Sequence, residues 1–151
     1  VLASVLLLNG PNLNLLGTRE PHVYGNTTLP EIEAAFTNLA ESFGLSTSCF
    51  QSNAESDLID RIHSARKENV GALVINPGAF GHTSVALRDA FLGTELPFVE
   101  VHISNVFARE DFRRQSLLSD IAIGVISGFG EQSYELGLRA VSSYLRKKNP
   151  L

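Results

Sequence analysis

The chain has 151 residues, of which 44% are hydrophobic and 19% charged, so it carries enough apolar surface for one domain with a buried core. Its net charge of −4 makes nucleic acid a poor partner, and no apolar run reaches the ~20 residues that a membrane span needs. The one cysteine, Cys49, permits no internal disulfide and no thiolate metal cluster; it fits a reducing compartment and is predicted to be a small buried side chain. We expect one cytoplasmic domain over residues 1–151 that binds neither nucleic acid nor membranes.

Strand and helix patterns alternate from the first residues onward. The apolar run 4–8 ends at Asn9-Gly10-Pro11 and predicts a buried strand. Thr28 begins a capping-box pattern with Pro30 in the first turn, and the helix that it opens closes at Gly44. Later runs predict strands over 45–50, 71–75, 97–101 and 121–126, and helices around 58–65, 83–92 and 134–148.

Five apolar strands that alternate with helices predict an α/β fold. Right-handed crossovers favour a three-layer, doubly wound, flavodoxin-like arrangement with a five-stranded parallel sheet. Ligands of such sheets bind beyond the carboxyl ends of the strands. The site is therefore expected among the segments 9–27, 51–55, 76–84, 102–114 and 127–133.

Polar side chains gather in these segments. The connection after the first strand is about 18 residues long, far above the usual 2–6, which indicates a functional loop. Because strand side chains alternate, Glu100 and His102 face the same side and can share one network. The candidates from the loops after strands one, three and four are Asn12, Arg19, His22, Tyr24, Asn76, Gly78, Ala79, His82, Ser104, Arg109 and Arg113.

These residue types suit acid–base work on a carboxylate substrate. Arginines bind carboxylates through paired N–H donors, and a tyrosine and a histidine can divide the proton transfers. The chain's lysines (Lys67, Lys147 and Lys148) lie away from the expected pocket, so no lysine is in place to form an imine with the substrate. No GxSxG turn follows a strand, so the sequence does not favour a serine nucleophile either. His63 is expected on a solvated helix face and His22 in a solvated loop.

Two other readings of the same residues stay open. His82, His102 and Glu100 could bind zinc, although HExxH spacing and a clear third ligand are missing. The stretch 78–81 is a loose match to a phosphate loop and lacks the lysine of that motif. The alternatives are thus a flavin- or phosphate-binding module of the same fold and a metal hydrolase.

Four long motifs resemble type II 3-dehydroquinate dehydratases, and the resemblance runs nearly end to end. They are Leu8–Pro21 followed by Tyr24-Gly25, Phe50–Asn53, Ile75–Ala79 with His82-Thr83-Ser84, and Glu100–Asn105. The resemblance implies a cofactor-free, metal-free lyase that converts 3-dehydroquinate to 3-dehydroshikimate and water. That reaction serves either aromatic amino acid biosynthesis or quinate breakdown.

The resemblance also implies roles for individual residues. Tyr24 is the general base and Arg19 favours its ionised form, while Asn12 holds a water that stabilises the enolate. His102, in a network with Glu100, protonates the departing hydroxyl. The substrate-binding positions implied are Asn76, Gly78, Ala79, His82, Asp89, Ile103, Ser104, Arg109 and Arg113.

The family further implies a closed homo-oligomer built from trimers, most simply a dodecamer, to which Asp89 contributes across a subunit contact. Phe80 and Gly81 stand where the family usually has tyrosine and threonine. We expect this difference to affect packing near His82 and not the chemistry.

Overall fold

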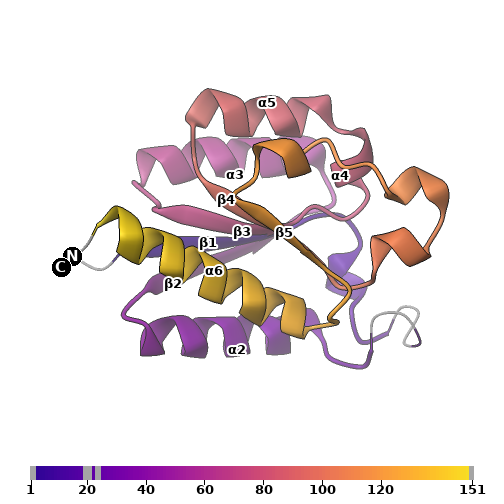
Figure 1. Ribbon diagram of the computed structural model, residues 1–151, viewed down its shortest axis with the longest axis horizontal. Coiled ribbons are helices and arrows are strands. Elements are labelled where there is room, and N and C mark those ends of the chain that lie inside the picture. The colour runs from indigo at the N-terminus through magenta and orange to yellow at the C-terminus, as the bar shows by residue number, and fades with distance from the viewer. Residues whose placement is uncertain (1–2, 19–21, 23–24, 150–151) are drawn as a thin grey trace.

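The computed structural model describes residues 3–18, 22 and 25–149 and contains a five-stranded sheet. All strand pairs are parallel, and the order is β2-β1-β3-β4-β5 (Figure 1). This is the flavodoxin-like order that the alternating pattern predicts. The strands are β1 (Ser4–Asn9), β2 (Ser46–Gln51), β3 (Ala72–Asn76), β4 (Phe98–His102) and β5 (Gly124–Ser127).

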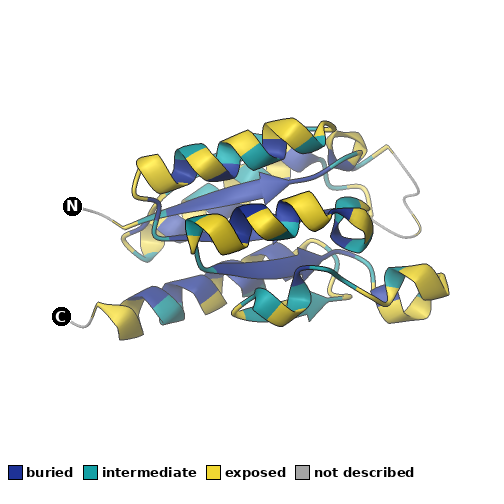
Figure 2. Ribbon diagram, turned by 90° about the horizontal axis from the view of Figure 1, so that it is seen from above, coloured by how far each residue is buried: buried dark blue, intermediate teal, exposed yellow. Residues whose placement is uncertain are grey.

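The helices form a layer on each face of the sheet. Alternating side chains of β1 enter different cores: Val5 and Leu7 pack into one, Leu6 and Leu8 into the other. The first core also contains the apolar stripes of α2 (Leu29–Ser42) and α6 (Gln132–Lys148); the second contains those of α3 (Glu55–Lys67) and α5 (Val85–Thr94). Figure 2 shows these helices buried on the sheet side and exposed outward.

The start of α2 follows the predicted capping box. Thr28 Oγ1 accepts the Glu31 N–H at 3.4 Å and donates to Glu31 Oε1 at 2.9 Å, and a proline lies in the first turn. Gly44, with φ of 74°, follows the helix end. In the described ranges, no helix is both long and apolar enough to cross a bilayer.

Three local predictions need correction. The helix expected over 83–92 is present as α5 but begins at Val85, because Ser84 is extended and its Oγ caps the Leu87 N–H at 2.9 Å. A separate single turn, α4 (Phe80–Thr83), precedes it and was not predicted. The fifth strand begins at Gly124 rather than Ile121, since residues 119–121 form the 3-10 turn η4 and only 124–127 pair with β4. Cys49 is only partly buried, at the margin of the first core.

Candidate active site

The loops that follow β1 and β3 fit closely against each other at the carboxyl edge of the sheet. The Gly10 N–H donates to the Asn76 carbonyl oxygen at 2.8 Å, which continues the pairing of the two strands. A Cβ atom at Gly10 would lie 2.3 Å from the Pro77 carbonyl oxygen. At Gly78, where φ is 57°, it would lie 3.1 Å from the Pro11 carbonyl oxygen. Only glycine permits such a close approach. Gly10 and Gly78 therefore allow the two loops to pack against each other.

Asn12 occupies the left-handed conformation, with φ of 68°, at the start of the short 3-10 helix η1 (Leu13–Leu15). Its N–H donates to Asn53 Oδ1 at 2.9 Å, and Gln51 Nε2 donates to the same oxygen at 3.1 Å. Gln51 Nε2 also donates to the Gly10 carbonyl oxygen at 3.1 Å. Asparagine tolerates this conformation better than other residues with a side chain. The motif 50–53 therefore holds the loop that carries Asn12.

Glu100 and His102 form a buried acid pair at the end of β4. The side chain of Glu100 is fully buried, and His102 Nε2 donates to its Oε2 at 2.5 Å. This confirms that the two residues share one network. Burial raises the pKa of Glu100, but the hydrogen bond and positive charge of His102 and the hydrogen bonds from Ser119 and Ser116 outweigh it, so the net pKa is lowered from 4.5. The carboxylate is therefore ionised beside the imidazole.

His82, on the one-turn helix α4, lies next to His102 at the end of β4. The two rings stack, with centroids 6.1 Å apart and an interplanar angle of 19°. A carbonyl oxygen only accepts, so His82 Nδ1 donates to the Gln115 carbonyl at 2.7 Å and must carry a proton. The neighbouring Gly81 is buried, and a Cβ there would lie 2.8 Å from Pro77 Cγ. Glycine at this position thus brings α4 closer to the β3 loop than a threonine allows.

Asn76 is held by Tyr134 of α6, a residue that was not predicted to belong to the site. Its Nδ2 donates to Tyr134 Oη at 2.9 Å, and its Oδ1 accepts the Gly78 N–H at 3.1 Å. Tyr134 Oη in turn donates to Asn9 Oδ1 at 2.6 Å. Burial raises the pKa of Tyr134, which keeps the hydroxyl protonated as this donor. A buried tyrosine usually needs a partner for its hydroxyl, and that was the available signal.

Two arginines complete the cationic side of the site. Arg109 Nη1 donates to Ser104 Oγ at 3.3 Å, and Arg113 Nε donates to Glu110 Oε1 at 2.9 Å. The bond from Arg113 holds the pKa of the Glu110 carboxyl below its usual range. The Ile103 carbonyl oxygen accepts from the Gly130 N–H at 2.9 Å, and the Ser104 carbonyl oxygen accepts from Ser127 Oγ, at the end of β5, at 3.1 Å.

These groups surround one cavity of about 230 Å³ at the carboxyl edge of the sheet. Ten of the residues predicted for the site line it: Asn12, Asn76, Gly78, Ala79, His82, His102, Ile103, Ser104, Arg109 and Arg113. Glu100 lies behind His102 rather than at the cavity surface, through the hydrogen bond given above. The predicted segments after β1, β3 and β4 therefore line one cavity, whereas the segments 51–55 and 127–133 contribute no described residue to its lining.

Other predicted residues lie elsewhere. Asp89 is exposed on α5 and does not line the cavity. His22 and His63 are exposed, as expected for solvated side chains. Arg19 and Tyr24 lie outside the described residues. Among those described, no group of three His, Cys, Asp or Glu side chains is placed to hold a metal ion.

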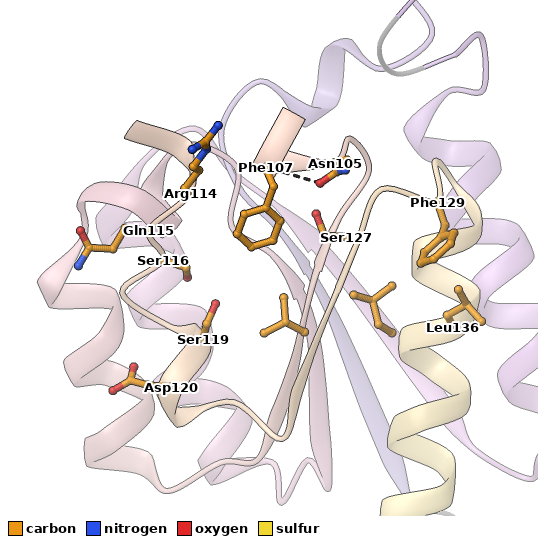
Figure 3. Close-up of a pocket in the computed structure, with 12 residues that line it drawn as sticks. Asn105, Phe107, Arg114, Gln115, Ser116, Ser119, Asp120, Ser127, Phe129 and Leu136 are labelled. Carbon is orange, nitrogen blue, oxygen red and sulfur yellow. Dashed lines mark hydrogen bonds between the residues drawn. The ribbon is translucent and has the colours of Figure 1, made fainter. Parts of the chain in front are cut away.

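A larger and more open hollow, of about 840 Å³, lies beside the edge strand β5 (Figure 3). It is lined by exposed aromatic side chains, Phe107 and Phe129, and by Val125 of the strand. Among the described residues that line it, Arg114 and Asp120 are charged and none is a histidine. The smaller cavity, which is lined by two histidines, is therefore the candidate site for acid–base chemistry.

Fold and site together define a class: a flavodoxin-like α/β protein whose strand-end cavity combines a carboxylate–imidazole pair with arginines and amides. Residues 3–142 match the family model described as Dehydroquinase class II, and the chain belongs to this family. It is 58% identical to a 3-dehydroquinate dehydratase of Teredinibacter turnerae over 149 residues, which covers 99% of this chain and 97% of the relative.

Solved structures agree with the family assignment. The type II dehydroquinase of Propionibacterium acnes is 39% identical, with a TM-score of 0.88 over 93% of this chain and 96% of that one. The enzyme of Butyrivibrio crossotus is 38% identical, with a TM-score of 0.90 over 93% and 97% of the two chains.

Proposed function

We propose that this protein is a hydro-lyase that converts 3-dehydroquinate to 3-dehydroshikimate and water. The observation that carries the proposal is the buried Glu100–His102 pair in a cavity with two arginines, in a chain 58% identical to a 3-dehydroquinate dehydratase. The base removes a proton from the carbon next to the ketone and gives an enolate. The enolate then expels the β-hydroxyl, which leaves as water after it receives a proton from the acid.

Tyr24 is the proposed base, and Arg19 the group that keeps it ionised. A proton next to a ketone is weakly acidic, so the base must be strong yet deprotonated near neutral pH. A guanidinium beside a phenol meets that need, because the positive charge stabilises the tyrosinate. The support is the motif Leu8–Pro21 with Tyr24-Gly25 and the family of the chain.

His102 is the proposed acid. Its Nε2 is engaged by Glu100, which leaves Nδ1 as the ring nitrogen for the departing hydroxyl. An ionised carboxylate on one side of the ring stabilises the imidazolium needed to donate from the other side. Asn12, fixed at the rim by Asn53, holds a water that stabilises the enolate oxygen.

The remaining cavity residues bind the substrate. We assign the substrate carboxylate to the N–H groups of Ile103 and Ser104, two residues that line the cavity. Arg109 and Arg113 add charge at the same end. Contacts to the substrate hydroxyls are assigned to Asn76, Gly78, Ala79 and His82.

We further propose that residues 1–151 act as one cytoplasmic domain that forms a trimer-based homo-oligomer, most simply a dodecamer. Closed symmetry is the usual form of homo-oligomers, and exposed Asp89 can reach a neighbouring subunit. Light scattering should return a multiple of three chains; a stable 16.4 kDa monomer at working concentration would contradict this.

The decisive assay follows ultraviolet absorbance of the conjugated product after 3-dehydroquinate is added. We expect product with the parent protein, with and without a chelator, and after borohydride treatment in the presence of substrate. Loss of activity under either treatment would point to a metal or an imine and overturn the cofactor-free mechanism.

Variants then test the roles of the groups. His102→Ala should lower kcat by about 10²–10⁴-fold and change KM little. Tyr24→Phe should be inactive at all pH values, whereas Arg19→Ala should recover part of its activity in base. Near-normal turnover by Tyr24→Phe would mean that another group takes the proton.

A further inference from the structure

Glu100 is bound on both carboxylate oxygens, and only one of the bonds comes from the histidine. Oε2 accepts from His102 Nε2, while Oε1 accepts from Ser119 Oγ at 2.7 Å and from Ser116 Oγ at 3.1 Å. The two serines come from a single stretch of chain that ends in η4 (Ser119–Ile121), as Figure 3 shows. They are 16 and 19 residues from Glu100 in sequence, and no motif singled them out.

This stretch contacts His82 directly and is linked to His102 through Glu100. The Gln115 carbonyl accepts from His82 Nδ1, and the Leu117 N–H donates to the Gly81 carbonyl at 2.8 Å, beside His82. The two serines reach His102 through Glu100. The stretch is held to α5 from outside, because Arg88 Nη1 donates to the Leu117 carbonyl at 2.9 Å. We name residues 115–119 the serine segment.

We propose that Ser116 and Ser119 are positioning residues of the acid, which keep Glu100 ionised and aimed at His102. This rests on the proposed function, since it assigns the histidine the role of proton donor. A buried carboxylate without further donors takes up a proton, and a protonated Glu100 no longer stabilises the imidazolium. Hydroxyl groups solve this problem, because they donate a hydrogen bond at neutral pH without losing their proton.

The surroundings of Glu100 make its titration a specific readout. The carboxylate of Glu100 faces His102 on its own strand and the hydroxyl groups of Ser116 and Ser119 on the serine segment. His82 stacks on the ring of His102, and the nearby Asp120 is paired with Arg88, with Nη2–Oδ2 at 3.0 Å. Burial raises the pKa of Glu100, while the hydrogen bond and the positive charge of His102 and the hydrogen bonds from Ser119 and Ser116 lower it.

The test compares two variants of equal shape. Valine and threonine differ by a methyl group in place of a hydroxyl, so Ser119→Val removes the donor and excludes water, whereas Ser119→Thr keeps the donor. Both are combined with Ser116→Ala. Asp120→Asn is the control, since it weakens the ion pair with Arg88 next to the serine segment and leaves the hydrogen bonds to Glu100 in place. Carbon-13 NMR of labelled glutamate carboxyls, assigned with Glu100→Gln, gives the pKa of Glu100 directly, and kcat is measured across the acid range.

With Ser116→Ala/Ser119→Val we expect the pKa of Glu100 to rise by about one unit or more, the acid limb of kcat to move up with it, and kcat at neutral pH to fall about tenfold. KM should stay near that of the parent. Ser116→Ala/Ser119→Thr should recover most of both values, and Asp120→Asn should keep the parental acid limb.

Two results would overturn the proposal: an unchanged pKa of Glu100 in the valine variant, or a fall in kcat of equal size in the valine and threonine variants. A parent protein without activity on 3-dehydroquinate would instead refute the proposed function, and the NMR titration would still decide whether the serines keep Glu100 ionised.

Discussion

Replacement of Tyr134 by phenylalanine tests the hydrogen-bond bridge beneath the cavity. In the parent the hydroxyl donates to Asn9 at 2.6 Å and accepts from Asn76 at 2.9 Å, and all three side chains are buried. The substitution leaves one buried acceptor and one buried donor without a partner, each at a cost of about 1–3 kcal/mol. We therefore expect the free energy of unfolding to fall by about 2–6 kcal/mol, and Tm by roughly 4–24 °C.

The measurement is urea and thermal unfolding at one protein concentration. Tyr144→Phe on the same helix is the matched control: its hydroxyl makes no hydrogen bond within the described residues, so this variant should stay near the parent. Because Asn76 lines the cavity, Tyr134→Phe should also raise KM for 3-dehydroquinate. An unfolding free energy for Tyr134→Phe within about 0.5 kcal/mol of the parent would refute the reasoning, since that is the size of an ordinary neutral substitution.

Three further outcomes can be checked by standard methods. Gly10→Ala should lower the free energy of unfolding by about 1–3 kcal/mol and lower activity, because the new Cβ would lie 2.3 Å from the Pro77 carbonyl oxygen. Gly93→Ala on α5 is the control: its Cβ would enter open space, so urea unfolding should show a neutral or stabilising effect. The folded-state pKa of Glu100 lies below 4.5, so its contribution to stability is present above the unfolded value and is lost as pH falls through the folded one. The urea midpoint of the parent should accordingly fall more steeply in acid than that of Glu100→Gln. Partial burial raises the pKa of Cys49 to about 11, so a thiol reagent at mildly basic pH should react slowly with native protein and fast in urea; equal rates would contradict the partial burial.

Short-range regularity was enough to predict most of the fold. The apolar run of β1 predicts a strand buried on both faces, and the structure places Leu6 and Leu7 in opposite cores. The capping box at Thr28 predicts the start of α2. These signals act over a few residues, where backbone geometry alone relates one side chain to the next.

The same regularity predicted that Glu100 and His102 lie close to each other. Residues two apart on a strand face one side, and Glu100 and His102 are indeed bonded. The polar loops were predicted to meet because parallel strands end at one edge. The apolar pattern predicted a helix that begins at Thr83, but the side chain of Ser84 caps α5. The helix therefore begins at Val85, and its predicted start was wrong.

The partners that hold the site in place depend on the tertiary structure. Tyr134 lies 125 residues from Asn9, and Ser119 lies 19 from Glu100, yet the first pair is joined by a buried hydrogen bond and the second by a partly buried one. Periodicity reports which face of an element is apolar, but it carries no information on which distant polar group is packed against that face. Such pairs form only when helix and sheet layers exclude water and each buried donor must find its acceptor, and that requirement is met by the folded chain as a whole.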